Sequence, residues 1–94
     1  MILLLVEPTK GTHFRINANT ANMKALPQFI IQVYDDLSLQ ESCGYQCTKE
    51  PDCHSIVYNA NTHNCLLQSV DSGMMYVKST NIISAPGYTW YDRY

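Results

Sequence analysis

Four cysteines and two histidines are the residues of this chain best suited to chemistry, and they lie close together in the sequence. Thiolate and imidazole groups bind zinc, and a thiolate beside a histidine can act as a nucleophile. Cysteines can instead pair as structural disulfides, as they do in small secreted domains. The residues concerned are Cys43, Cys47, Cys53, His54, His63 and Cys65.

The spacing of these residues favours disulfides over a metal site or a catalytic thiol. The C-x3-C pair at Cys43 and Cys47 has no matching second pair of the kind found in zinc ribbons. Cys53 and His54 are adjacent, so in a strand their side chains would point to opposite faces. A sulfur already bonded to another sulfur cannot serve as a thiolate. We therefore expect no metal, no cofactor and no nucleophilic cysteine.

A helix at residues 38–49 is expected to position the first two cysteines. Ser38 and Glu41 have the spacing of a capping box, in which the serine oxygen accepts from an early backbone amide of the helix and the glutamate accepts from the Ser38 amide. Pro51 disfavours helical geometry in the residue before it and so predicts the end of the helix near Lys49.

The helix restricts how the cysteines can pair. Leu39, Cys43 and Cys47 recur every four residues and should form its buried face. Side chains one turn apart have Cβ atoms about 5–6 Å apart, whereas a disulfide needs about 3.8 Å. Cys43 and Cys47 should therefore each bond elsewhere. A loop can return Cys53 to the helix end, which favours Cys47–Cys53 with Cys43–Cys65 over Cys43–Cys53 with Cys47–Cys65.

The rest of the chain has the pattern of an antiparallel sheet. Short apolar or alternating runs are separated by turn-forming residues, and the runs on either side of NANTHN should form a hairpin. A length of 94 residues with 15% charged residues is typical of one folded domain, residues 1–94. The expected strands are 2–6, 13–17, 29–34, 54–58, 65–69, 74–78 and 88–94.

The order of these features resembles the PAN/Apple module family, whose core pattern is a helical C-x3-C followed by C-x-x-F-x-Y and C-x-L. The resemblance implies an α+β fold, a curled antiparallel β-sheet with one α-helix packed on it. It also implies two bridges that join the helix to the sheet, in the pairing favoured above. Apple domains proper carry a third bridge, for which this chain has no cysteines, so the likeness is to the four-cysteine PAN type. The matching positions are Cys43, Cys47, Cys53, Ile56, Tyr58, Cys65 and Leu67.

The resemblance implies an extracellular, non-catalytic module for binding or adhesion that recognises a protein or a carbohydrate. Elsewhere the sequence has no GxSxG, HExxH, P-loop or GxGxxG element, so we expect no enzyme activity. The six basic residues are scattered singly, which argues against a nucleic-acid partner. The apolar run at residues 2–6 is too short to cross a membrane or to act as a secretory signal, so an export signal would have to lie upstream.

The final expected strand carries aromatic residues on both faces. Strand alternation places Tyr88 and Trp90 on one face and Tyr91 with Arg93 on the other. We expect Trp90 and Tyr88 to fill the core beneath the helix, because aromatic side chains bury the most area. Tyr91, Arg93 and His54 are the candidate ligand-binding residues, as an exposed patch that stacks on a sugar ring or anchors a protein partner.

An apolar run precedes the part of the chain that matches the family, and we interpret residues 1–10 as an N-terminal strand extension. In one interpretation this strand completes the domain's own sheet. In the other it pairs with the sheet edge of a neighbouring copy, and head-to-tail repetition of that contact builds a filament. The second function class is therefore a self-assembling structural subunit of an extracellular filament or matrix. The residues of this assembly strand are Ile2, Leu3, Leu4, Leu5 and Val6.

Overall fold

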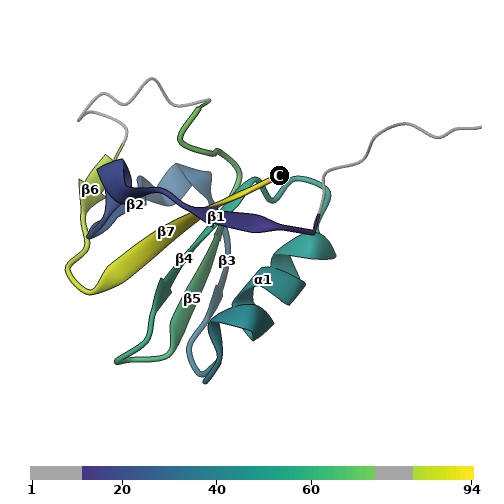
Figure 1. Ribbon diagram of the computed structural model, residues 1–94, viewed down its shortest axis with the longest axis horizontal. Helices are drawn as coiled ribbons and strands as arrows, with labels where there is room; N and C mark the ends of the chain where they lie inside the picture. Colours follow the sequence, from purple (N-terminus) through teal and green to yellow (C-terminus); the bar gives the residue numbers. More distant parts are fainter. Residues whose placement is uncertain (1–11, 74–81) are drawn as a thin grey trace, which may run out of the picture.

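The computed structural model describes residues 12–73 and 82–94 (Figure 1). These residues form an α+β fold with antiparallel strands and one α-helix, which confirms the fold class predicted from the sequence. A five-stranded sheet has the order β1-β7-β4-β5-β3, and a two-stranded sheet pairs β2 with β6. The elements are β1 Phe14–Ile16, β2 Met23–Ala25, β3 Ile30–Tyr34, α1 Gln40–Thr48, β4 Ser55–Asn59, β5 Asn64–Gln68, β6 Ile82–Ser84 and β7 Tyr88–Arg93, with 3-10 turns at Ala18–Thr20 and Pro27–Phe29.

The strand predictions hold for most of the described chain. The expected strands at 13–17, 29–34, 54–58, 65–69 and 88–94 correspond to β1, β3, β4, β5 and β7. The two strands of the small sheet were not predicted, because each is only three residues long and shows no clear alternation. The expected strands at 2–6 and 74–78 lie outside the described residues.

The polar stretch between β4 and β5 closes the expected hairpin. The side-chain oxygen of Asn59 accepts hydrogen bonds from the backbone amides of Asn61, at 2.9 Å, and Thr62, at 3.1 Å. His63 completes the turn with a φ of 64°, in the left-handed region. The side-chain oxygen of an asparagine in such a turn accepts bonds from nearby backbone amides in place of a backbone carbonyl. This is why the sequence NANTHN supports a tight reversal.

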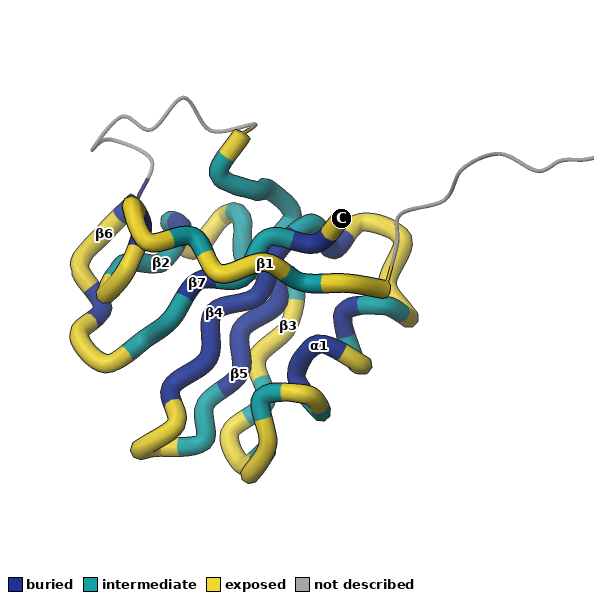
Figure 2. Tube along the Cα trace, in the orientation of Figure 1, coloured by how far each residue is buried: buried dark blue, intermediate teal, exposed yellow. Residues whose placement is uncertain are grey.

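The five-stranded sheet separates two apolar cores, and burial is greatest in its central strands β4 and β5 (Figure 2). The core on the helix side contains the four cysteines with Ile56, Tyr58 and Leu67. The core on the opposite side packs against the β2–β6 sheet and contains Ala25, Val57, Leu66, Ile82 and Trp90.

The prediction that Trp90 and Tyr88 lie beneath the helix is wrong. Trp90 is fully buried, but in the core next to the β2–β6 sheet, and Tyr88 packs against the same core. In the β4–β7 pairing Trp90 lies opposite Val57 and Tyr91 lies opposite Ile56, so alternation turns Tyr91 toward the helix. The sequence could not assign the faces because it gave no sign of a second layer on the far side of the sheet.

The helix begins later than expected and without the predicted capping box. Leu39 occupies the N-cap position with an extended backbone and makes no side-chain cap. Ser38 therefore lies outside the helix, and Leu39 is 57% exposed instead of buried. The buried face of α1 consists of Cys43, Gly44 and Cys47.

Two disulfides attach α1 to its surroundings. Cys43 is bonded to Cys65 in β5, with a Cα–Cα distance of 5.6 Å, and Cys47 is bonded to Cys53 in the loop before β4, at 5.4 Å. This is the same pairing that the helical spacing favours. Because each of the four sulfurs is part of a disulfide, none is available as a zinc ligand or a nucleophile.

Candidate functional site

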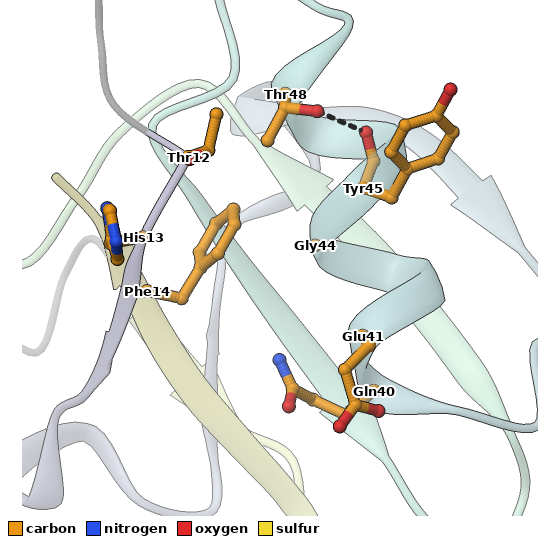
Figure 3. A pocket seen from close by; sticks show the side chains of 8 residues that line it. All are labelled: Thr12, His13, Phe14, Gln40, Glu41, Gly44, Tyr45 and Thr48. Carbon is orange, nitrogen blue, oxygen red and sulfur yellow. Dashed lines mark hydrogen bonds between the residues drawn. The ribbon is translucent and has the colours of Figure 1, made fainter.

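A pocket of about 520 Å³ lies between β1 and one face of α1 (Figure 3). The helix contributes positions four residues apart, which lie on one side of it. The segment that leads into β1 forms the opposite wall. The described residues that line the pocket are Thr12, His13, Phe14, Gln40, Glu41, Gly44, Tyr45 and Thr48.

A glycine in the middle of the helix allows β1 to approach it closely. A Cβ atom added to Gly44 would lie 3.0 Å from Cε2 and 3.2 Å from Cδ2 of the Phe14 ring. Few real Cβ contacts are this short, so a larger residue would require the Phe14 ring to shift by a few tenths of an ångström. Phe14 also packs against the helix-side core, and its ring points across the pocket toward Gly44 (Figure 3). Gly44 therefore fixes the spacing of the two walls.

The lining surface of the pocket is mostly apolar, although several of its residues carry a polar group and one of these groups is charged. Glu41 is the one residue with a formal charge at neutral pH among the described residues that line the pocket. The Thr48 hydroxyl donates a 2.6 Å hydrogen bond to the Tyr45 carbonyl, so its oxygen is left with lone pairs that can accept a bond. A largely apolar wall that also carries polar groups is typical of a ligand site.

Tyr45 is an exposed aromatic residue of the pocket, at 61%. Figure 3 shows its ring on the side of the helix that faces away from Phe14. The Lys49 ammonium group lies 5.0 Å from the centre of this ring, in cation–π geometry. The ring thus already holds a cation on one face.

Tyr91, a predicted ligand-binding residue, lies beside the pocket. It is half-buried, packs against the helix-side core and is paired with Ile16 across the β1–β7 ladder. Burial raises the pKa of the Tyr91 phenol, and the negative charge of Glu41 and the phenol of Tyr58 raise it further. Glu41 is therefore close enough to both the pocket and Tyr91 to affect them electrostatically.

The raised pKa of Tyr91 predicts a loss of stability in alkaline solution. A phenol whose pKa is higher in the folded state stabilises the fold fully below its unfolded pKa of 10.0, and this contribution is lost as the pH rises through the folded pKa. We expect Glu41→Gln to lower the pKa of Tyr91 part of the way, because burial remains the larger cause. NMR titration of the Tyr91 ring measures this, with Glu50→Gln as a control carboxylate outside the pocket. An unchanged Tyr91 titration in Glu41→Gln would contradict the assignment.

The prediction that Arg93 belongs to an exposed patch is wrong. Its side chain is 9% exposed, and its guanidinium group donates hydrogen bonds to backbone carbonyls at the end of α1 and in the loop that follows. The acceptors are the carbonyl oxygens of Cys47, Glu50 and Cys53, at 3.1, 3.1 and 3.0 Å, and of Thr48, at 3.4 Å. Burial lowers the pKa of this guanidinium group. Arg93 connects β7 to the helix terminus instead of facing solvent.

His54 lies on the same face of the sheet as Arg93 and directly beside it. The Arg93 amide donates to the His54 carbonyl at 3.0 Å, and the His54 amide donates to the Gln68 carbonyl at 2.8 Å. Its side chain is half-buried. Tyr91 and Arg93 share one face of β7, as the alternation indicates, but the three predicted residues form no exposed patch, because Tyr91 and His54 are half-buried and Arg93 is buried.

The residues that form the pocket were not predicted from the sequence. Glu41 was noted only as part of a cap, and Phe14, Gly44 and Tyr45 were not singled out. Two signals point to them in retrospect. A glycine inside a helix marks a close contact, and residues at intervals of four mark one helix face.

Other site types find no support in the described residues. Within residues 12–73 and 82–94, no group of three or more histidine, cysteine or acidic side chains could hold a metal ion. The helix in this part of the chain is also not long and apolar enough to cross a membrane.

Comparison with known protein families finds a match for most of the chain. A family model described as "PAN domain" matches residues 15–92, which include every element from β2 to α1, the hairpin and most of β1 and β7. This confirms the resemblance found in the sequence. No curated protein matches the chain.

Proposed function

The chain belongs to the PAN domain family, and from that premise we propose that it is an extracellular, non-catalytic module whose ligand occupies the pocket between β1 and α1. PAN domains are generally non-catalytic and bind proteins or carbohydrates. The fold alone does not specify the ligand, so the proposal depends on the site.

The observation that carries the proposal is a mostly apolar pocket with polar groups along one wall, on a rigid helix. Both cysteines of α1 are bonded to neighbouring elements, and Arg93 binds the carbonyls at its end. A wall held in this way loses little conformational freedom when a ligand binds, which favours affinity. The pocket therefore has the preorganisation that a binding site needs.

The cysteines support an extracellular location. All four are fully buried and disulfide-bonded. Structural disulfides persist in oxidising compartments and are rare in the cytosol. PAN domains are also typically extracellular.

A matched pair of exposed tyrosines tests the location of the site. Tyr45 lines the pocket and is 61% exposed, whereas Tyr94 lies outside its lining and is 54% exposed. We expect binding of the wild-type chain to an array of glycans and extracellular proteins to be weakened by Tyr45→Ala and retained by Tyr94→Ala. Both substitutions leave the buried cores intact. Binding that survives Tyr45→Ala and is lost in Tyr94→Ala would place the site elsewhere.

A second candidate function is self-assembly through the apolar segment at residues 2–6, which lies outside the described residues. The observation that favours it is the edge strand β3, which among the described strands pairs only with β5. Edge strands usually carry charges that discourage pairing. β3 instead has the sequence IIQVY, and its Val33 is 47% exposed. A five-residue apolar strand from another copy is a suitable partner for this edge.

The oligomeric state of the full chain tests this second function. If residues 2–6 add to β3 of another copy, Val33→Lys should shift the chain toward monomer, and so should removal of residues 1–8. Ile83→Lys is the matched control, because Ile83 is an exposed apolar residue, at 37%, on the small sheet. Light scattering after size-exclusion chromatography measures the mass. A wild-type chain that stays monomeric at all concentrations would exclude this function.

A further inference from the structure

We infer that the ligand of this pocket is an extended segment of a partner protein, which adds a strand to the outer edge of β1 and places a lysine or arginine side chain beside Glu41. The inference rests on the proposed function and specifies it, since it names both the partner and the mode of binding. It depends on the edge of β1, the composition of the pocket and its charges.

The backbone of β1 has one edge without a strand partner in the described part of the chain. His13 and Tyr94 exchange amide-to-carbonyl bonds of 3.3 and 2.9 Å, and the Asn17 amide donates to the Trp90 carbonyl at 2.9 Å. In an antiparallel pair the bonded residues alternate, so Arg15 also faces β7. The backbone groups of Phe14 and Ile16 therefore point away from β7, and a further strand can pair with them.

The pocket lies beside this edge. Thr12, His13 and Phe14 form its strand-side wall, so a segment paired with β1 passes along the mouth of the pocket. Alternate side chains of that segment point to one face, and one of them can enter the space between β1 and α1. The partner is thus held by backbone bonds at β1 and selected by the side chain that enters the pocket.

The lining of the pocket fits a long side chain with a cationic end. The Phe14 ring and the hydrocarbon parts of the threonines offer apolar contact, and Glu41 offers a single negative charge. Lysine and arginine combine an apolar stem with a positive head, so both parts find a matching surface. An acidic side chain would instead be repelled by Glu41.

The position of Lys49 directs the incoming cation toward Glu41. The Lys49 ammonium lies over the Tyr45 ring at 5.0 Å from its centre. A second cation on that face would be repelled, whereas Glu41 has no basic partner within ion-pair distance among the described residues. Figure 3 also shows the Tyr45 ring turned away from Phe14, so the two rings do not form a common platform for a sugar. These features favour a basic peptide over a carbohydrate.

NMR titration of the isotope-labelled full chain with three synthetic peptides tests the inference. Each peptide has five residues that alternate threonine and valine around a central lysine, norleucine or glutamate. We expect the lysine peptide to shift the amides of Phe14, Ile16 and Gly44 and to bind about fivefold more tightly than the norleucine peptide, as a partly exposed ion pair allows. Glu41→Gln should remove this difference, and Glu50→Gln, an exposed carboxylate outside the pocket, should preserve it.

Three results would overturn the inference. The first is equal affinity for the lysine and norleucine peptides, or no binding of either at millimolar concentration. The second is that the shifts fall on β3 instead of β1. The third is that methyl glycosides shift the pocket amides while the peptides do not. The last result would leave the proposed function intact, because a pocket that loses its ligand in Tyr45→Ala remains the site whatever its ligand is.

Discussion

Replacement of both Cys43 and Cys65 by alanine should lower the free energy of unfolding by about 3 kcal/mol. This disulfide joins residues 22 positions apart in the sequence and connects the middle of α1 to β5. Without this disulfide the unfolded chain has more conformational entropy. Folding must then pay the entropic cost of closing the loop between the two residues. Urea unfolding followed by the fluorescence of Trp90, the single and fully buried tryptophan, measures the change.

The second disulfide provides the comparison. Cys47 and Cys53 are 6 positions apart, so the same reasoning gives about 2 kcal/mol for their replacement by alanine. The first double variant should therefore be the less stable of the two. A larger loss from the Cys47–Cys53 pair would contradict this order and would mean that native contacts around the helix end outweigh the effect of loop length.

The features that the sequence predicted are those that local chemistry determines. The spacing of Cys43 and Cys47 on a helix limits their partners, and the resulting pairing is the one in the structure. The hairpin follows from Asn59 and the residues after it, which bond within the turn itself. Neither feature requires knowledge of the chain outside residues 43–65.

The features that the sequence did not predict depend on contacts between segments that lie far apart in the chain. Gln68 has the appearance of a surface residue at the end of a strand, yet it is fully buried. Its amide oxygen accepts a 2.8 Å bond from the Ala25 amide, and its amide nitrogen donates at 2.8 Å to the Ser55 hydroxyl. It therefore links the two sheets. No local pattern shows that a polar side chain will find such partners.

The candidate site was missed for the same reason. Its walls are formed by residues 12–14 and by α1, which lie far apart in the sequence. They come together because β1 pairs with β7 at one edge of the sheet and because Gly44 admits the Phe14 ring. The alternation of aromatic and charged residues within the last strand pointed instead to Arg93. In the structure the guanidinium group of Arg93 donates hydrogen bonds to backbone carbonyl oxygens around it.

Arg93→Met should destabilise the fold by about 3 kcal/mol, the second large effect that we expect. Methionine keeps most of the apolar stem but removes every donor. The carbonyl oxygens of Cys47, Cys53 and Glu50 would then lose a charged partner in a place that water reaches poorly. Hydrogen bonds to charged groups contribute more than neutral ones. The Cys47 and Glu50 carbonyls keep backbone donors, the amides of Glu50 and Cys53 at 3.0 Å, so most of the loss comes from the charged bonds themselves. The measurement is again urea unfolding followed by tryptophan fluorescence.

Two further variants separate charge from geometry. Arg93→Lys keeps the positive charge but replaces the planar fork with a single ammonium group, which cannot reach the same set of carbonyls, so we expect it to recover less than half of the loss. Arg15→Met is the control, because Arg15 is exposed and contacts the Tyr94 ring at 4.4 Å, and it should cost less than 1 kcal/mol. If Arg93→Lys were as stable as the wild type, the general positive charge, and not the directed bonds, would be what holds the helix end to β7. A wild-type-like Arg93→Met would show that neither does, and that the two disulfides alone fix α1 against the sheet.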